Sequence, residues 1–447
     1  MSDRVDSVAT HFDLARRVFC LIAGRRRVAP LSACDSMGWI ERQTEEIERD
    51  RALQFLGLAL ALANALTFAY WQLTLPVVEV LAPGAIPICW PFFSECHALR
   101  VLSANALSSM LWGYLAVSLV AALAFASPRF ARVGYWILFA LLFYRGFFLF
   151  QDYRLRLNQH YMLYWSMFAF LFVPGKRVAI RYLVILFYFW AGIIKLNPEW
   201  LSGAALHGGS PLLIPASLVP AACVYVVVLE LILIFGLLSK RTSLFWATLA
   251  QLAVFHLTSW SIVGFYYPLL MVCILSIFVL DRYIQPPPQQ ELPQVPLLTR
   301  GRRIAIGVLL GGFFSMQLVP HVYPGDTAIT GEGRFFALHM FDAPLECQAF
   351  ALELTDAGPQ ALVTLEAPHV PKRIECDPIV YWSIARQICR SNRTNRDFVD
   401  IGVLLRTRRM GQSDWQRVMA LQHFCQTNPE YRVLGHNDWI LIDPGSQ

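Results

Sequence analysis

The chain has 447 residues, of which 56% are hydrophobic and only 15% are charged, and its mean hydropathy is +0.47. Because soluble domains usually carry about 25% charged residues, this composition excludes a soluble globular protein and indicates a polytopic membrane protein. The net charge of +6 comes mostly from arginines and lysines between apolar runs, so it gives no reason to expect nucleic-acid binding.

Residues 1–50 form a polar N-terminal segment that is rich in arginine. Val18, Phe19, Leu21 and Ile22 stand among these arginines, which indicates a short amphipathic segment. The segment has no apolar core of its own, so we expect no cleavable signal peptide.

Residues 51–320 form the predicted membrane domain, an all-α polytopic bundle. Apolar runs of roughly 17–25 residues predict transmembrane helices. Nine such runs occur, at 53–72, 105–126, 133–150, 160–174, 179–195, 221–238, 243–261, 264–280 and 304–320. The fourth run is short and the polar stretch before it can dip into the membrane, so eight or ten spans stay open. We find no internal repeat, which argues against an inverted-repeat transporter.

The orientation follows from the positive charges between the spans. One set of loops carries most of them, at Arg129, Arg132, Lys176, Arg177, Arg181, Lys240, Arg241, Arg282, Arg300, Arg302 and Arg303. Loops rich in lysine and arginine stay in the cytoplasm. We therefore expect an integral protein of the bacterial inner membrane, with a cytoplasmic N-terminus and a periplasmic C-terminal domain.

Residues 321–447 form the predicted C-terminal domain. Alternating apolar residues predict strands at 349–354, 361–365 and 401–405, and a helical pattern covers 378–389. The sequence thus predicts a small extramembrane α+β domain. The run Gln-Pro-Pro-Pro-Gln-Gln at 285–290 predicts a polyproline II spacer before the last span.

Six of the ten cysteines fall on the side of the membrane predicted to be oxidising: Cys89, Cys96, Cys347, Cys376, Cys389 and Cys425. Disulfides are expected there. The loop between the first two spans permits a Cys89–Cys96 bridge, and spacing leaves three pairings open for the other four. No CxxC pair or HxxxH motif accompanies them, so we expect no metal site.

Five ionisable residues interrupt the apolar spans: Arg145, His160, Lys195, Glu230 and His256. A charge at the bilayer centre costs about 2.5–3.5 kcal/mol even on the lenient insertion scale, so each is expected to have a partner inside the bundle. Arg145 with Glu230 is one candidate structural pair. Both histidines can equally be hydrogen-bonded core residues.

Lys195 permits two interpretations from its position alone. At the end of an apolar run, it can extend to the headgroups as an ordinary helix-terminal lysine. Alternatively, burial disfavours the ammonium form, and an uncharged amine shielded from water can act as a base towards a lipid-soluble cofactor.

Residues 188–203, YFWAGIIKLNPEWLSG, resemble the stretch around the catalytic lysine of vitamin K-dependent gamma-carboxylase, whose second lysine falls on Lys195. Residues 158–164, NQHYMLY, resemble the segment that carries the functional histidine, which falls on His160. Glu230 falls on an intramembrane acid of the family, and His256 falls in its Phe-His pattern. Residues 330–342, TGEGRFFALHMFD, are similar to bacterial relatives, the horizontally transferred transmembrane (HTTM) family.

The resemblance implies an enzyme that couples oxidation of a reduced, vitamin K-like quinone to carboxylation of a peptide glutamate, with O2 and CO2 as co-substrates and no metal. It implies Lys195 as the base and His160 as the residue that orients an intermediate. Supporting residues would be Asn158, Gln159, Glu230, His256 and Trp200, and Tyr188, Phe189 and Trp190 would flank the quinone ring. The expected partners are membrane lipid, the quinone and a secreted peptide or protein.

The sequence also departs from the family pattern. Ile194 replaces the first lysine of the pair, Asn197 replaces an aspartate and Gln159 replaces an asparagine. These changes leave open a non-catalytic HTTM protein that acts in maturation of, or immunity to, a secreted peptide. A transporter with an ion path through Arg145, Glu230 and His256 is a third alternative.

Overall fold

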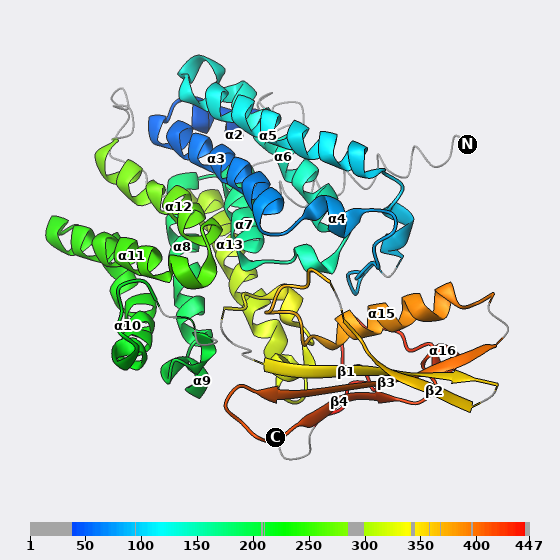
Figure 1. The fold of residues 1–447 in the computed structure, drawn as a ribbon. Helices are drawn as coiled ribbons and strands as arrows, with labels where there is room; N and C mark the ends of the chain where they lie inside the picture. Colours follow the sequence, from blue (N-terminus) through cyan, green and yellow to red (C-terminus); the bar gives the residue numbers. More distant parts are fainter. Residues whose placement is uncertain are drawn as a thin grey trace, which may run out of the picture.

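The computed structural model describes residues 38–93, 95–206, 209, 211–284, 299–340, 345–356, 358–366, 368–394 and 397–442. The described chain forms a bundle of long helices beside a four-stranded sheet that is covered by a helix (Figure 1). The predictions for residues 1–37 and for the polyproline II spacer lie outside the described residues.

The first half of the bundle consists of long helices, of which α3 and α5 are joined by a long loop that contains two short helices. Its elements are α2 (Trp39–Glu48), α3 (Arg51–Leu73), α4 (Val77–Leu81), η2 (Cys96–Leu99), α5 (Ala104–Ala126), η3 (Pro128–Phe130), α6 (Ala131–Leu149), η4 (Tyr153–Leu155) and α7 (Asn158–Phe172). Asp50 begins α3 as its N-cap, because its carboxylate accepts hydrogen bonds from the first backbone N–H groups of the helix.

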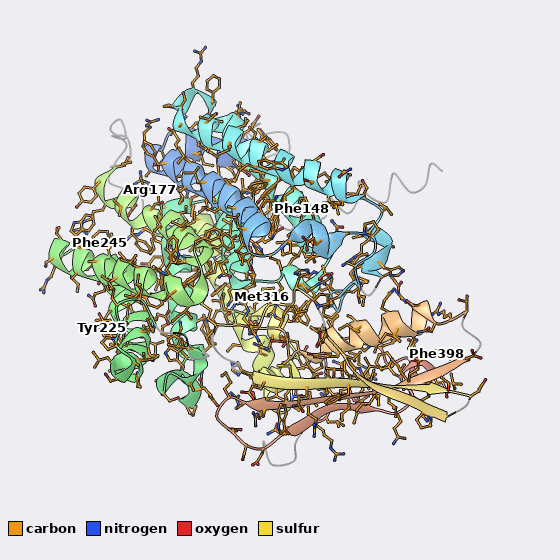
Figure 2. All side chains as sticks on the ribbon, in the orientation of Figure 1. Phe148, Arg177, Tyr225, Phe245, Met316 and Phe398 are labelled. Carbon is orange, nitrogen blue, oxygen red and sulfur yellow. A yellow bond between two sulfur atoms is a disulfide. The ribbon has the colours of Figure 1, made fainter. Side chains whose placement is uncertain are left out.

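In the second half, α8 lies at the centre and packs against α7, α10, α12 and α13. Its elements are α8 (Lys176–Ile194), α9 (Pro198–Leu201), η5 (Ala204–Leu206), η6 (Ala216–Leu218), α10 (Val219–Leu231), η7 (Leu233–Leu238), α11 (Thr242–Val263), α12 (Tyr266–Tyr283), α13 (Arg300–Leu318) and η8 (Val319–Val322). Figure 2 shows the side chains that fill the bundle, with Phe148 fully buried and Tyr225 largely exposed on the outer surface.

Seven helices among the described residues are long and apolar enough to cross a membrane, which confirms an integral membrane protein. They contain α3, α5, α6, α8, α10, α12 and α13. The predicted count of nine is not confirmed. The predicted fourth and seventh spans are helical, but α7 has only 15 residues, and α11, which carries polar residues such as Gln251 and His256, is not among the seven.

The C-terminal domain is a small α+β unit, as predicted. Its antiparallel sheet has the order β2-β1-β3-β4, with β1 (Leu345–Thr355), β2 (Gly358–Thr364), β3 (Phe398–Arg409) and β4 (Gln416–Leu421). The helix α15 (Pro378–Ser391) lies along one face of the sheet in Figure 1. The short helices α14 (Thr327–Thr330), η9 (Arg334–Phe336) and α16 (Phe424–Thr427) complete the domain.

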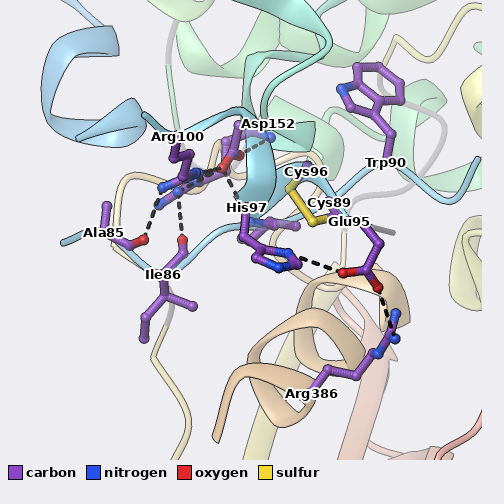
Figure 3. The surroundings of a disulfide bond; sticks show 12 residues. Ala85, Ile86, Cys89, Trp90, Glu95, Cys96, His97, Arg100, Asp152 and Arg386 are labelled. Atoms are coloured by element: carbon purple, nitrogen blue, oxygen red, sulfur yellow. Dashed lines mark hydrogen bonds and ion pairs between the residues drawn. A yellow bond between two sulfur atoms is a disulfide. The ribbon is translucent and has the colours of Figure 1, made fainter. Parts of the chain in front are cut away.

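Three disulfides stabilise this side of the molecule: Cys89–Cys96, Cys347–Cys376 and Cys389–Cys425. The first confirms the bridge that the loop spacing permitted, and the other two select one of the three open pairings. Figure 3 shows the first bridge beside Glu95, whose carboxylate lies 2.6 Å from Arg390 and 3.6 Å from Arg386 of α15. The loop between α3 and α5 therefore rests on the C-terminal domain.

Replacing both Cys89 and Cys96 with serine is expected to lower the free energy of unfolding by about 2–3 kcal/mol, because the bridge closes a short ring and restricts the unfolded chain. Thermal unfolding of the purified protein in detergent, under non-reducing conditions, measures this loss. A matched control replaces the two free cysteines, Cys223 and Cys273, with alanine, which adds no polar group to the bundle. A serine variant of Cys89 and Cys96 that unfolds at the wild-type temperature would contradict the prediction.

Candidate functional site

Lys195 ends α8 as its C-cap and points into the bundle, not towards the headgroups. Its side chain is 1% exposed, and its Nζ lies 2.7 Å and 2.6 Å from the two carboxylate oxygens of Glu230 in α10. The carboxylate itself is fully buried. The structure therefore excludes the interpretation of Lys195 as an ordinary helix-terminal lysine.

Gly192 explains why the two helices approach closely enough for this pair. A Cβ atom at Gly192 would lie 2.8 Å from the Leu231 side chain and 3.1 Å from the Glu230 Cβ, so no larger residue fits without a shift of α10. Gly192 lies three residues before Lys195, on the neighbouring turn of α8. The Ala-Gly pair in the sequence motif thus has a packing role beside the lysine.

The turn after Lys195 builds one wall of the site. The indole of Trp200 lies under the ammonium, with Nζ 5.2 Å from the ring centroid, and its Nε1 donates to the Cys223 carbonyl at 3.0 Å. Asn197 caps α9, because its Oδ1 accepts from the Trp200 backbone N–H at 2.8 Å. Asn197 therefore fixes the turn that positions Trp200, and an amide performs this capping as well as a carboxylate does.

His256 and Tyr188 extend the polar region beyond the ion pair. The Tyr188 hydroxyl lies 2.6 Å from His256 Nε2, and the Tyr267 ring packs edge-on against the imidazole at 5.2 Å. Electrostatic interactions link Lys195 to His256 and Glu230 to both tyrosines. Lys195, Glu230, Tyr188, His256 and Tyr267 form one buried cluster, which we call the lysine cluster.

His160 belongs to a second cluster, which includes Tyr266 of α12. Its Nδ1 lies 2.5 Å from Arg145 Nη2 and 3.2 Å from the Tyr266 hydroxyl. Tyr70 and Trp71 of α3 place their rings 6.3 Å and 5.4 Å from the imidazole. We call Arg145, His160, Tyr266, Tyr70 and Trp71 the histidine cluster.

The two predicted catalytic residues, Lys195 and His160, therefore make no direct contact. Tyr266 in the histidine cluster and Tyr267 in the lysine cluster are consecutive residues at the start of α12. The two clusters are thus neighbours through the first turn of one helix.

Asn158 holds the C-terminal domain against α7. Its Oδ1 accepts from the His339 backbone N–H at 2.9 Å, and its Nδ2 donates to the His339 carbonyl. Both ends of the amide are used, so Asn158 positions the start of α7 against the C-terminal domain. Gln159 is half-buried, and its Oε1 has no hydrogen-bond partner among the described residues.

Tyr188, Phe189 and Trp190 point to three different neighbours, as expected for consecutive residues on a helix. Tyr188 contacts His256, Phe189 packs on Phe235 of η7, and Trp190 packs on Phe314 of α13. The structure does not bring the three rings to one place. Phe189 and Phe314 instead line an apolar groove of about 490 Å³ between α8, η7 and α13.

The predicted pair of Arg145 with Glu230 is wrong, because Glu230 binds Lys195 and Arg145 contacts His160. The sequence showed which residues are costly to bury but not which of them meet. Tyr70, Tyr266 and Tyr267 were missed, since tyrosines in apolar runs are common. Their one available signal is the adjacent Tyr266-Tyr267 pair in a segment rich in functional candidates.

The described residues contain no group of three or more histidine, cysteine, aspartate or glutamate side chains that could hold a metal ion. Comparisons of the chain with protein-family models, with curated proteins and with solved structures find no match.

Proposed function

We propose that this chain is an HTTM-type membrane enzyme which, like vitamin K-dependent gamma-carboxylase, couples oxidation of a reduced quinone to carboxylation of a peptide glutamate. The observation that carries the proposal is that Lys195, in the stretch that resembles the catalytic segment of that family, is buried and paired with Glu230 of α10. An intramembrane ionisable residue is a functional candidate by default.

The pair is suited to proton transfer because its two groups are in hydrogen-bond contact, so a proton can pass from one to the other. Lys195 Nζ accepts a proton from a substrate hydroxyl when it is an uncharged amine. Glu230, at 2.6–2.7 Å, receives that proton in turn and returns the amine to its uncharged form. Trp200 and Gly192 hold the two groups in place. Lys195 thus acts as the base, and Glu230 is its proton partner.

The chain has features that fit a quinone with a hydrocarbon tail. The groove beside Phe189 is almost entirely apolar. The Trp190 ring packs on Phe314 of that groove, and its Nε1 is buried with no hydrogen-bond partner among the described residues. An apolar groove suits the tail, and an indole N–H suits a ring oxygen. A bound reduced quinone would supply the electrons that reduce O2, while CO2 replaces the glutamate Cγ proton.

The proposed location is the bacterial inner membrane, with the N-terminus in the cytoplasm and the C-terminal domain in the periplasm. Two observations support it. All three disulfides lie in the C-terminal domain or in the loop that rests on it, and disulfides persist in oxidising compartments. The excess of lysine and arginine lies in the alternate loops.

The proposal is tested with the purified protein in lipid nanodiscs, supplied with vitamin K hydroquinone, O2, labelled bicarbonate and a glutamate-rich peptide. We expect label in the peptide together with epoxide. The variant to compare with the wild type is the double variant Lys195→Met with Glu230→Leu, which removes the base without leaving a buried charge. Loss of general-base catalysis is expected to lower the rate by about 10²–10⁴-fold.

Two outcomes would contradict the proposal. One is the absence of both products from the wild-type protein, which would favour the non-catalytic maturation or immunity role. The other is an equal rate in the wild type and in a folded double variant, which would mean that the pair has only a structural role.

A further inference from the structure

Arg145 is a fully buried arginine without an acidic partner among the described residues. It lies in α6, at 0% exposure, among apolar residues of the bundle. Its Nη2 contacts His160 and the Tyr266 hydroxyl, and its guanidinium lies over the Tyr164 ring at 5.2 Å. Its Nε and Nη1 have no hydrogen-bond partner among the described residues.

The other buried arginines of the described chain differ from Arg145 in this respect. Arg100 and Arg154 both bind Asp152, and Arg334 binds Asp377. A buried guanidinium is stable only when paired, because leaving an uncompensated buried charge costs about 3–5 kcal/mol. Among the described residues, Arg145 therefore has no negative charge beside it to compensate for its burial.

The described neighbours of Arg145 supply two neutral acceptors, His160 Nδ1 and the Tyr266 hydroxyl, but no negative charge. Because Arg145 Nη2 is a donor, His160 Nδ1 must accept, and the ring proton then resides on Nε2. His160 Nε2 is also buried and has no partner among the described residues. Arg373 of the C-terminal domain adds a second positive charge that acts electrostatically on His160. The unmatched atoms of the histidine cluster are therefore all N–H donors.

We propose that Arg145 and His160 bind a small oxyanion of the carboxylate class within the histidine cluster. A guanidinium matches the geometry of a carboxylate, and charge-assisted hydrogen bonds of this kind are about twice as strong as neutral ones. The surrounding rings of Tyr70, Trp71 and Tyr164 leave the anion few other polar partners. Free bicarbonate and the carboxylate of a glutamate substrate both have this chemistry.

The site is independent of the proposed carboxylase activity, because it rests on unmatched donors and not on the lysine cluster. A binding measurement without quinone therefore separates the two proposals. The wild-type protein in phosphatidylcholine nanodiscs is titrated with bicarbonate, N-acetylglutamate and chloride, and its unfolding temperature is followed. We expect saturable stabilisation by one or both carboxylate-type anions and a much weaker response to chloride.

Arg145→Gln is the test variant and Arg177→Gln is its control, since Arg177 is a membrane-domain arginine already paired with Asp50 and Asp281. We expect Arg145→Gln to weaken anion binding at least about tenfold, because the variant loses one charge-assisted hydrogen bond to the anion. We expect Arg177→Gln to leave anion binding unchanged. Without anion, Arg145→Gln should unfold no earlier than the wild type, because it removes an unpaired charge. If Arg145 had only a structural role, Arg145→Gln would unfold at a lower temperature than the wild type.

The response to the two carboxylate-type anions identifies the source: bicarbonate alone indicates a free co-substrate, and N-acetylglutamate indicates a side chain. Arg145→Lys provides a second variant, which keeps the charge and is expected to bind more weakly than the wild type. The proposal is overturned by a wild-type protein that none of the anions stabilises, by equal stabilisation with chloride, or by undiminished binding in Arg145→Gln.

Discussion

Replacing Lys195 with methionine is expected to lower the free energy of unfolding by about 3–5 kcal/mol, because it leaves the Glu230 carboxylate buried and unpaired. The carboxylate has both oxygens on Lys195 and is fully buried, so the substitution removes the partner of both oxygens. Unfolding of the purified variant in detergent, followed by thermal scanning or by SDS titration, measures the loss.

The double variant Lys195→Met with Glu230→Leu is the matched control for this effect. Replacing a buried ion pair with apolar residues of similar volume is often neutral or stabilising, so the double variant should recover most of the lost stability. A double variant as unstable as Lys195→Met would show that packing of the lysine stem, not the unpaired charge, causes the loss.

Replacing Asp152, in the loop between α6 and α7, with asparagine is expected to have an effect of similar size, about 3–5 kcal/mol. The Asp152 carboxylate is fully buried and binds both Arg100 and Arg154, as Figure 3 shows for Arg100. It also accepts from the backbone N–H groups of Ile88 and Arg154 at 3.2 Å and 2.9 Å. Asparagine has one acceptor oxygen and no charge, so both guanidinium groups lose their anion.

Arg100 is the more sensitive of the two arginines. Burial lowers the pKa of its guanidinium and the charge of Asp152 opposes that shift, so Asp152→Asn removes the compensation. Arg154 keeps three carbonyl acceptors, at Val80, Ile86 and Pro368. Thermal unfolding and expression level measure the effect, and the exposed Asp414→Asn is the control. Equal unfolding temperatures for the two variants would refute the prediction.

The helices of the bundle could be predicted from the sequence because each span is a separate run of apolar residues. Contacts between spans join residues that are distant in the sequence, and no such local pattern indicates them. Lys195 and Glu230 were both identified, but Glu230 was assigned to Arg145, since periodicity within a helix does not fix the register between helices. Gly192 offers the physical signal that was available, because a glycine beside a polar residue favours close helix packing at that level.

The strands of the sheet could also be predicted only in part. β1 and β3 contain stretches of alternating burial and were predicted, whereas β4 buries the consecutive residues Val418 and Met419 and gives no alternation. The Cys89–Cys96 bridge closes a short local ring, and its spacing indicated it. The pairings of the other four cysteines depend on the fold of the C-terminal domain, in which Cys347 lies on β1 and Cys389 lies on α15.

The double contact between Asn158 and the His339 backbone sets an order of events during biosynthesis. His339 lies 181 positions after Asn158, and Arg373, which donates to the His339 carbonyl at 3.1 Å, follows later still. The segment before His160 therefore has its final partners only after the ribosome has passed residue 373. After every span has been inserted, the segment that precedes His160 still has no contacts with the C-terminal domain. The histidine cluster therefore reaches its final structure only when the C-terminal domain folds.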